Sequence, residues 1–310
     1  MTAMSTRTLA KVEGVAAALI SNCLLGLSSL YWKALAAMPA ITLLGFRVLM
    51  SLLCVSMLLA LRQELSPLLR DLSKRDLLLH GAAALLVATN WATFIWASIH
   101  GHVLESGLGY LIAPILVISL GLLLYRERLS LSRGMSLSLV LASLLYLLLN
   151  TDGLDYRVSM VIGVTWGGYA YLKKLARLPP WSGLFVESLM LSSLLVPLAL
   201  WLNAPAQEIA ALEAGDQGLL LLCGVVSLLP LALFSFATRR LPLSGMGLMQ
   251  FVLPLTQLCV ALSFYGQSPS LGTLLAFAVI ALAILLVVLE PLLNPVCMKT
   301  KEIIENDSSL

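Results

Sequence analysis

Uncharged polar and aromatic side chains recur inside the most apolar stretches of this sequence, at spacings that match a helix. Asn90 and Phe94 lie four positions apart, so they occupy one face of a helix. Ser106 and Tyr110 repeat that spacing. Such groups either bind an organic solute by hydrogen bonds and stacking, or bond one helix to another and fill the core. The further candidates for a binding site of this kind are Asn22, Trp91, Trp166, Tyr169, Phe234, Gln250 and Gln257.

Catalytic and cofactor motifs do not accompany these residues. The sequence holds no GxSxG, HExxH or Walker A pattern, and no Cys/His spacing typical of a metal site or a disulfide framework. No basic cluster dominates a segment outside the apolar runs, which argues against nucleic-acid binding. We therefore expect no enzyme, no cofactor and no metal, but a protein of the lipid bilayer that binds a small-molecule substrate.

The elements that must position these residues are long apolar runs. The chain has 310 residues, of which 60% are hydrophobic and 11% charged, whereas soluble domains carry about 25% charged residues. Runs of about 18 or more apolar residues cross roughly 30 Å of hydrocarbon as helices. We expect an all-α polytopic membrane protein with ten transmembrane helices, at about 12–33, 40–61, 77–99, 103–125, 131–149, 158–174, 181–201, 217–237, 244–265 and 271–290.

Basic residues are distributed unevenly among the connections between these spans. With the N-terminus inside, sixteen of the nineteen Lys and Arg residues lie on the inner side, and only Lys33 and Arg157 on the outer side. Arg47 lies within the second span. Cytoplasmic connections are enriched in Lys and Arg, so we expect both termini in the cytoplasm and the chain in the plasma membrane of a bacterium, its inner membrane.

A shift of 140 positions, for example from 31 to 171, aligns the first half of the sequence with the second half without a gap. We call it the repeat shift. It takes Tyr31 onto Tyr171, and other matching pairs are Pro39 with Pro179, Phe94 with Phe234 and Tyr125 with Tyr265. Each copy has five helices, and because five is odd, the second copy starts from the opposite side of the membrane. We expect one repeat at 1–150, an inverted repeat at 151–295 and a disordered cytoplasmic tail at 296–310. Inverted repeats are typical of secondary transporters that work by alternating access; a channel or a non-transporting scaffold is the alternative.

Two stretches, GLGYLIAP at 107–114 and GLMQFVLP at 247–254, occupy equivalent positions in the two copies. Gly107 and Gly247 allow helices to pack closely in lipid. Pro114 and Pro254 each remove one helical hydrogen bond and favour a bend. We expect these four residues to act in gating, and the alternative is that they only shape the bundle.

Two charged residues inside the spans, Arg47 and Glu187, are also equivalent under the repeat shift. Arg47 lies about seven residues from the outer end of its span, and Glu187 about six residues from the inner end of its own. At about 1.5 Å per residue, about 10 Å separates them along the membrane normal, so we expect no direct ion pair. Each should find polar helix neighbours or water, or extend to its own interface. Arg47 is also a candidate for attracting a carboxylate in an outward-open state.

Four segments of the chain are distinctive: NWATFIWA (90–97), LESGLGYLIAP (104–114), YRERLS (125–130) and MQFVLP (249–254). Together they resemble the RarD/YddG-type members of the drug/metabolite transporter superfamily, which have EamA-type repeats. The resemblance runs from about residue 12 to about residue 290. It implies ten helices in two inverted repeats, and a central cavity lined by the first, third, fourth, sixth, eighth and ninth helices.

The resemblance also implies a function. YddG-type members export aromatic and other neutral amino acids, whereas RarD-like members are linked to drug sensitivity. The lining residues that it implies are Asn90, Trp91, Phe94, Tyr110 and Gln250. The RER sequence around Glu127 departs from the Gly-Glu common in the family, which leaves the role of that motif open. We expect an exporter of neutral amino acids or related metabolites that moves them down their gradient and that can act as a monomer. The alternative is a multidrug exporter.

Overall fold

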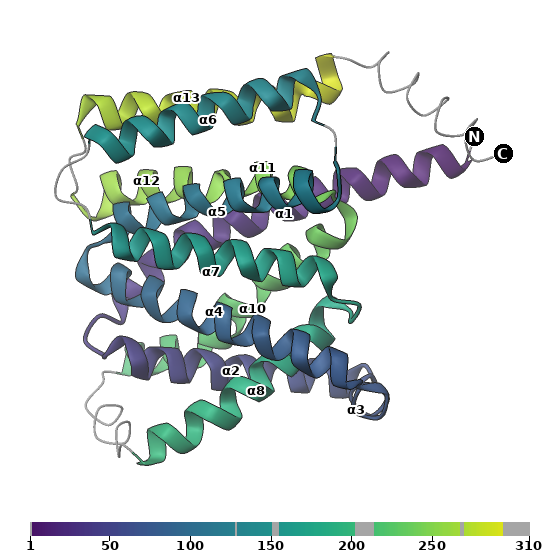
Figure 1. The fold of residues 1–310 in the computed structure, drawn as a ribbon. Helices are drawn as coiled ribbons and strands as arrows, with labels where there is room; N and C mark the ends of the chain where they lie inside the picture. The colour runs from purple at the N-terminus through teal and green to yellow at the C-terminus, as the bar shows by residue number, and fades with distance from the viewer. Residues whose placement is uncertain (1, 128, 151–154, 202–213, 267–269, 294–310) are drawn as a thin grey trace. The chain divides into compact units, whose positions relative to one another are not determined.

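The computed structural model describes residues 2–127, 129–150, 155–201, 214–266 and 270–293, and every regular element in these ranges is a helix (Figure 1). The all-α prediction is therefore confirmed for this part of the chain, and the tail expected at 296–310 lies outside it. The helices are α1 (Thr2–Ala34), α2 (Ala40–Leu61), α3 (Leu65–Asp71), α4 (Lys74–His100), α5 (Val103–Leu124), α6 (Leu131–Asn150), α7 (Tyr156–Leu175), α8 (Pro180–Trp201), α10 (Ala214–Arg240), α11 (Leu243–Gln250), α12 (Val252–Phe264) and α13 (Leu271–Leu293).

Among the described residues, seven helical segments are long and apolar enough to cross a membrane, in agreement with a multi-pass membrane protein. They are Val12–Ala34, Ala40–Leu61, Lys74–His100, Val103–Leu124, Leu131–Asn150, Gly215–Arg240 and Leu243–Phe264. A shorter apolar segment, Leu271–Leu286, lies within α13. By length and composition α7 is not among the seven, because basic residues near its ends and Tyr, Trp and Gly between them lower its hydropathy. The seven spans do not by themselves establish the ten that we expected.

The chain forms two compact units. In the first (1–127 and 153–268), α5 packs against α7, α11 and α12, while α4 packs against α7 and α8. The helices α1 and α2 both pack against α10, and Figure 1 shows α4, α7 and α5 side by side. In the second unit (128–152 and 269–310), α6 pairs with α13. Every candidate site residue lies in the first unit.

Helices in the two halves of the sequence begin in the same register. The repeat shift takes Ala40, the first residue of α2, onto Pro180, the first residue of α8. It likewise takes the first residues of α4, α5 and α6 onto those of α10, α11 and α13, respectively. The last residues of α2, α4 and α5 fall in the same way on those of α8, α10 and α12. The helix boundaries therefore repeat with the period found in the sequence.

Local signals explain where α4 begins and ends. The Ser73 hydroxyl accepts a hydrogen bond from the Asp76 N–H, and the Asp76 carboxylate accepts one from the Ser73 N–H, which forms a capping box. Gly101 ends the helix with φ +81°, a left-handed conformation that glycine adopts without a steric penalty. The helix α4 consequently starts three residues earlier than the predicted span at 77–99. The short helix α3 before it was not predicted.

Two basic residues that we expected on the inner side, Lys174 and Arg177, bond to other segments that we also expected there. Arg177 donates to both carboxylate oxygens of Asp76, from Nε at 2.8 Å and from Nη2 at 2.6 Å. Lys174 Nζ donates to the carbonyls of Thr238 and Leu241 at 3.0 and 2.7 Å. The start of α4, the α7–α8 connection and the end of α10 therefore lie at one end of the first unit.

Residues from the expected outer side meet at another set of helix ends. Lys33 Nζ donates to the Phe264 carbonyl at 2.7 Å. The hydroxyl of Tyr265 lies 3.0 Å from the carbonyl oxygens of both Ser29 and Ser98. The C-terminal parts of α1, α4 and α12 are thus tied together.

Candidate functional site

Five aromatic side chains from four helices form a connected group in the interior of the first unit. We call this group the aromatic cluster; it consists of Phe94 on α4, Tyr110 on α5, Trp166 and Tyr169 on α7, and Phe234 on α10. Ring centroids are 5.9 Å apart for Phe94–Tyr110 and for Tyr110–Trp166, and 4.9 Å apart for Trp166–Phe234. No ring is more than 6% exposed. The structure therefore brings together five of the predicted binding residues.

Close packing of α5 on α7 makes this arrangement possible. A Cβ atom on Gly109 would lie 2.7 Å from the carbonyl oxygen of Ser159, and one on Gly163 would lie 2.9 Å from Ile112 Cβ. Both distances are too short for a side chain, so only glycine permits this approach of the two backbones. The approach holds the α5 and α7 members of the aromatic cluster in contact.

Asn90 connects the aromatic cluster to the backbone of α7. Its Oδ1 accepts a hydrogen bond from the Tyr110 hydroxyl at 2.9 Å. Its Nδ2 donates to the carbonyl of Ile162 at 3.2 Å and to the Thr165 hydroxyl at 3.1 Å. The amide is fully buried, and its partners within the protein make it a positioning residue for Tyr110 in this conformation.

Three other predicted amides keep hydrogen-bonding capacity. Gln250 is buried, and neither atom of its amide has a partner in the described ranges. Gln257 accepts from the Ser106 hydroxyl at 3.2 Å, while its Nε2 has no described partner. Asn22 donates to the Ala18 carbonyl of its own helix, which leaves its Oδ1 without a described partner. These groups are not shown to touch the aromatic cluster, but their free atoms are available to a polar ligand.

Trp91 faces a charge rather than the cluster. The guanidinium carbon of Arg47 lies 3.9 Å from the centroid of the Trp91 ring and 5.1 Å from that of Trp32. Arg47 is 2% exposed, and its Nε and Nη1 have no hydrogen-bond partner among the described residues. Of the surroundings expected for Arg47, namely polar helix neighbours, water or its own interface, the described residues supply no polar neighbour to these two nitrogens, and two indole faces lie against the guanidinium instead.

Glu187 has the partners that Arg47 lacks. Its Oε1 lies 2.8 Å from Lys173 Nζ and 2.7 Å from His80 Nδ1, and its Oε2 accepts from the Tyr169 hydroxyl at 3.1 Å. All four side chains are buried. The prediction that Glu187 would not pair with Arg47 is confirmed. Sequence reasoning missed Lys173 and His80 as partners, although both lie near the predicted inner ends of their spans.

Three of the four gating candidates, Gly107, Pro114 and Gly247, lie at contacts between α5 and the α11–α12 pair, and the fourth, Pro254, is buried on α12. A Cβ on Gly247 would lie 3.1 Å from the Pro114 carbonyl and 2.7 Å from Ile118 Cγ1. A Cβ on Gly107 would lie 3.4 Å from Gln257 Oε1. Gly247 and Pro114 are therefore in direct contact, whereas Gly107 packs against α12.

The two proline-containing segments differ in continuity. The helix α5 runs unbroken through Pro114, but the predicted span at 244–265 divides at Phe251 into α11 and α12. Pro254 has no N–H to donate to the Gln250 carbonyl, which accounts for a weak point at this position. The predicted span at 244–265 is thus present as Leu243–Phe264, but its helix is interrupted at Phe251, which was not predicted.

Glu127, whose motif the sequence left open, caps α11. Its two carboxylate oxygens accept hydrogen bonds from the backbone N–H groups of Leu243 and Ser244 at 2.9 and 2.8 Å. Burial raises the pKa of Glu127, but the hydrogen bonds from Ser244 and Leu243 and the charge of Lys174 outweigh burial and lower the pKa below its ordinary value. A carboxylate at a helix N-terminus also interacts favourably with the helix dipole.

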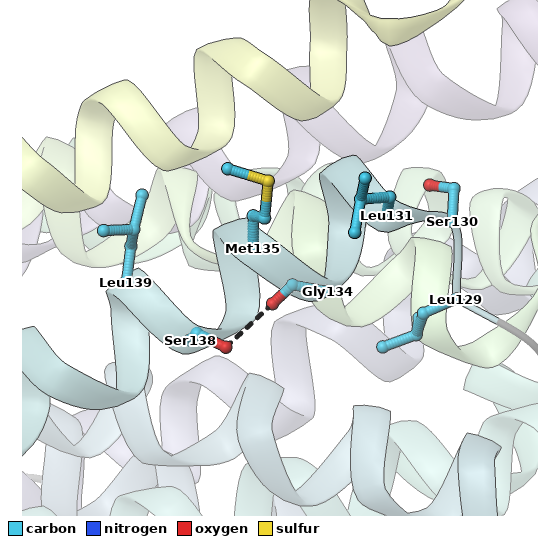
Figure 2. Close-up of a pocket in the computed structure, with 7 residues that line it drawn as sticks. All are labelled: Leu129, Ser130, Leu131, Gly134, Met135, Ser138 and Leu139. Carbon is cyan, nitrogen blue, oxygen red and sulfur yellow. Dashed lines mark hydrogen bonds between the residues drawn. The ribbon is translucent and has the colours of Figure 1, made fainter.

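Two surface grooves contain none of the predicted site residues. One is lined by Leu129, Ser130, Leu131, Gly134, Met135, Ser138 and Leu139 of the second unit (Figure 2). In Figure 2 the Ser138 hydroxyl bonds to the Gly134 carbonyl within α6, at 3.1 Å. The other groove lies in the first unit, between the α1–α2 connection and the end of α4. Neither groove carries the amides and rings of the interior site.

Comparison with known proteins shows the family to which the chain belongs. Residues 158–289 match the sequence profile of the EamA-like transporter family. The chain is 32% identical over 282 residues to the uncharacterized transporter YojE of Bacillus subtilis, covering 88% of this chain and 93% of that protein. It is 30% identical over 204 residues to the chloramphenicol-sensitive protein RarD of Pseudomonas aeruginosa, covering 66% and 67% of the two chains. A crystal structure that is 18% identical shares the fold, with a TM-score of 0.65 over 91% of this chain and 97% of that one.

Proposed function

The chain belongs to the drug/metabolite transporter superfamily as a RarD-like, EamA-type transporter, and from this premise we propose that it exports neutral amino acids, aromatic ones included, or related small metabolites. The observations that carry this proposal are the buried aromatic cluster and, elsewhere in the first unit, the buried amides of Gln250, Gln257 and Asn22 with their unpaired atoms. Such a lining suits an uncharged, amphiphilic organic body, because rings contact its apolar part and amides bind its polar part.

The architecture that we propose is ten spans in two inverted five-helix repeats, at 1–150 and 151–295. The helix boundaries that coincide under the repeat shift support this arrangement. We place both termini in the cytoplasm and the chain in the bacterial inner membrane. This orientation is supported by the contacts among the basic segments around Asp76, Lys174 and Arg177, since basic residues collect on the cytoplasmic side.

Transport proceeds by alternating access in this proposal. The side chains of the aromatic cluster, with Asn90, Trp91, Ser106, Gln250, Gln257 and Asn22, line the substrate path. The contact between Gly247 and Pro114 and the break at Phe251, before Pro254, form the flexible joint between α5 and α11–α12. Gly107 provides the close contact of α5 with α12. In this proposal substrate moves down its own gradient: the sequence has no Walker A motif to couple transport to ATP, and Glu105 and Glu187 lie away from the middle of their predicted spans, where a proton-coupled antiporter carries a titratable group.

The experiment is flux of labelled phenylalanine in liposomes that contain the purified chain. The proposal requires saturable movement that Gln250→Trp abolishes, because a bulky ring would fill the path. Leu123→Trp, at an exposed position of α5, is the control for added bulk and should leave flux unchanged. Movement that does not saturate would favour a channel, and no movement of any amino acid would contradict the proposal.

A multidrug exporter is the second candidate, because one relative is named for chloramphenicol sensitivity. The aromatic cluster would also accept an uncharged drug with a ring system. Resistance profiles of cells with and without the chain distinguish the two candidates. A wide change in drug resistance, together with no saturable amino-acid flux, would replace the first proposal with this one.

A further inference from the structure

We propose that Arg47, between Trp32 and Trp91, binds the carboxylate of the transported molecule, and that the substrates are therefore small organic carboxylates with a neutral or aromatic body. This inference rests on the proposed function, which it narrows from neutral metabolites in general to molecules that carry a carboxylate. Amino acids belong to this class, whereas their amides and amines do not.

The first argument is the charge balance around Arg47. The guanidinium is 98% buried, since its exposed fraction is 2%. Among the ion pairs formed by the described residues, none includes Arg47. The side chains shown against its guanidinium are the indoles of Trp32 and Trp91, which carry no charge. A buried cation without an acidic partner is costly, and an anionic ligand would supply the missing charge.

The second argument is the imbalance between donors and acceptors. Arg47 Nε and Nη1 have no hydrogen-bond partner in the described part of the chain, and neither do the indole N–H groups of Trp32 and Trp91. These four atoms belong to Arg47 and to the two indoles that its guanidinium contacts, and all four are donors that cannot accept. A ligand that satisfies them must present acceptor oxygens. A carboxylate does so, and its planar shape matches the edge of a guanidinium.

The third argument is that the two indole rings contact the guanidinium of Arg47 without using its N–H donors. Cation–π contacts place the Trp32 and Trp91 rings against the guanidinium of Arg47. The rings contribute apolar walls, but they carry no net charge and accept no strong hydrogen bond. They hold the guanidinium in place and leave its nitrogens available, which is the arrangement that a binding site for an anion requires.

The fourth argument links this site to the aromatic cluster. Trp91 follows Asn90 on α4, and Asn90 accepts the hydrogen bond of Tyr110. The guanidinium carbon of Arg47 lies 3.9 Å from the centroid of the Trp91 ring, so the cation lies against the chain neighbour of Asn90. A carboxylate held at Arg47 would therefore lie beside the part of α4 that carries Asn90 and the cluster residue Phe94. The combined site selects one negative charge together with an apolar or aromatic group.

The test measures the binding of four matched probes to the purified chain. The fluorescence of the buried tryptophans reports the binding. The probes are phenylalanine, phenylpropionate, phenylalaninamide and phenethylamine, of which the first two carry a carboxylate. We expect the wild type to bind the first two about 10- to 100-fold more tightly than the last two, because hydrogen bonds to charged groups are at stake. Equal affinity for all four probes would overturn the inference.

Variants at Arg47 show whether this residue is the source of the preference for carboxylate probes. Arg47→Gln should weaken binding of the carboxylate probes by about 10- to 100-fold and leave phenylalaninamide binding unchanged, which also shows that the variant is folded. Arg47→Lys should retain part of the preference because it keeps the charge. Arg70→Gln removes an exposed positive charge on α3 and is the matched control, with no expected effect. Preference for carboxylates that persists in Arg47→Gln would contradict the inference.

Flux in liposomes separates this inference from the proposed function. Saturable amino-acid flux that phenylalaninamide inhibits as well as phenylalanine would reject the carboxylate site and keep the transporter. Arg47-dependent carboxylate binding without any flux would keep the site and reject the proposed export. If Arg47→Gln does not fold, the probe preference of the wild type and of Arg47→Lys decides the matter.

Discussion

Arg47 on α2 and Glu187 on α8 occupy positions that are equivalent under the repeat shift, yet the protein treats their charges differently. Both side chains are almost completely buried. Glu187 has Lys173, His80 and Tyr169 within hydrogen-bond distance. Arg47 has the faces of Trp32 and Trp91 and no acidic partner in the described ranges.

The difference indicates two uses of a buried charge. Glu187 joins α8 to α4 and α7 through its partners, so its charge serves the packing of three helices. Arg47 makes no such connection, and a buried ion without a partner costs several kcal/mol even after relaxation. A fold that keeps this cost at one of two equivalent positions has a use for the charge, which we assign to the substrate.

The largest expected effect is on stability, at Glu187. Glu187→Gln leaves Lys173 buried without its counter-ion, and breaking a buried pair in this way costs about 3–5 kcal/mol. Unfolding in mixed micelles measures the loss. Glu64→Gln, which changes an exposed carboxylate, is the control and should be neutral.

A double variant sharpens this result. Lys173→Met in the Glu187→Gln background removes the stranded charge and should recover part of the lost stability. If Glu187→Gln alone costs less than about 1 kcal/mol, the contrast with Arg47 fails, because a loss that small is typical of exposed pairs.

The second prediction concerns Arg47→Met, which should have the opposite profile. Loss of the cation–π contacts and removal of an uncompensated charge oppose each other, so stability should stay within about 1 kcal/mol of wild type. Flux of amino acids should fall by about 10- to 100-fold, because the carboxylate loses charge-assisted hydrogen bonds. A stability loss as large as that of Glu187→Gln would show that Arg47 is structural.

Two tyrosines give a smaller test of the same contrast. Tyr169 donates to the Glu187 carboxylate and Tyr110 to the neutral amide of Asn90. Tyr169→Phe should cost about 1.5–3 kcal/mol and Tyr110→Phe about 1 kcal/mol, because hydrogen bonds to charged groups contribute more. Thermal unfolding of the two variants gives the order, and the reverse order would indicate that Glu187 does not depend on Tyr169.

The smallest expected effect is at Glu127, whose charge is held by backbone donors. Glu127→Gln weakens the cap of α11 and should cost about 1 kcal/mol, reduced by exposure to solvent. The pKa of Glu127 is lower in the folded state than its ordinary value of about 4.3. The contribution of this carboxylate to the free energy of unfolding is therefore complete above the ordinary pKa and is lost as the pH falls through the folded pKa. Unfolding curves of wild type and Glu127→Gln should therefore converge at acid pH. A stability difference that stays constant with pH would contradict the role of the carboxylate.

Much of the fold follows from local sequence, because helix ends depend on nearby residues. Ser73 and Gly101 mark the ends of α4 by capping chemistry, and long apolar runs mark the spans. The helix α3 was not predicted because its seven residues lie in a polar connection. The break at Phe251 was not predicted either, since Pro114 sits in a similar sequence in which α5 remains continuous.

The residue types of the candidate site were also predictable, but their partners were not. Helical spacing placed Asn90 with Phe94 and Ser106 with Tyr110 on shared faces. The bond from Tyr110 to Asn90 and the group around Glu187 join different helices, and no local pattern encodes which helices meet. The isolation of Arg47 among indoles depends in the same way on tertiary packing.

Competition in liposomes tests the central claim most directly. Flux of labelled phenylalanine is measured with increasing unlabelled phenylalanine or phenylalaninamide, in the wild type. We predict saturable flux that phenylalanine inhibits and that phenylalaninamide inhibits at least about tenfold more weakly, because only the former carries the acceptor that Arg47 requires. Equal inhibition by the two compounds would contradict the assignment of Arg47 to the substrate carboxylate.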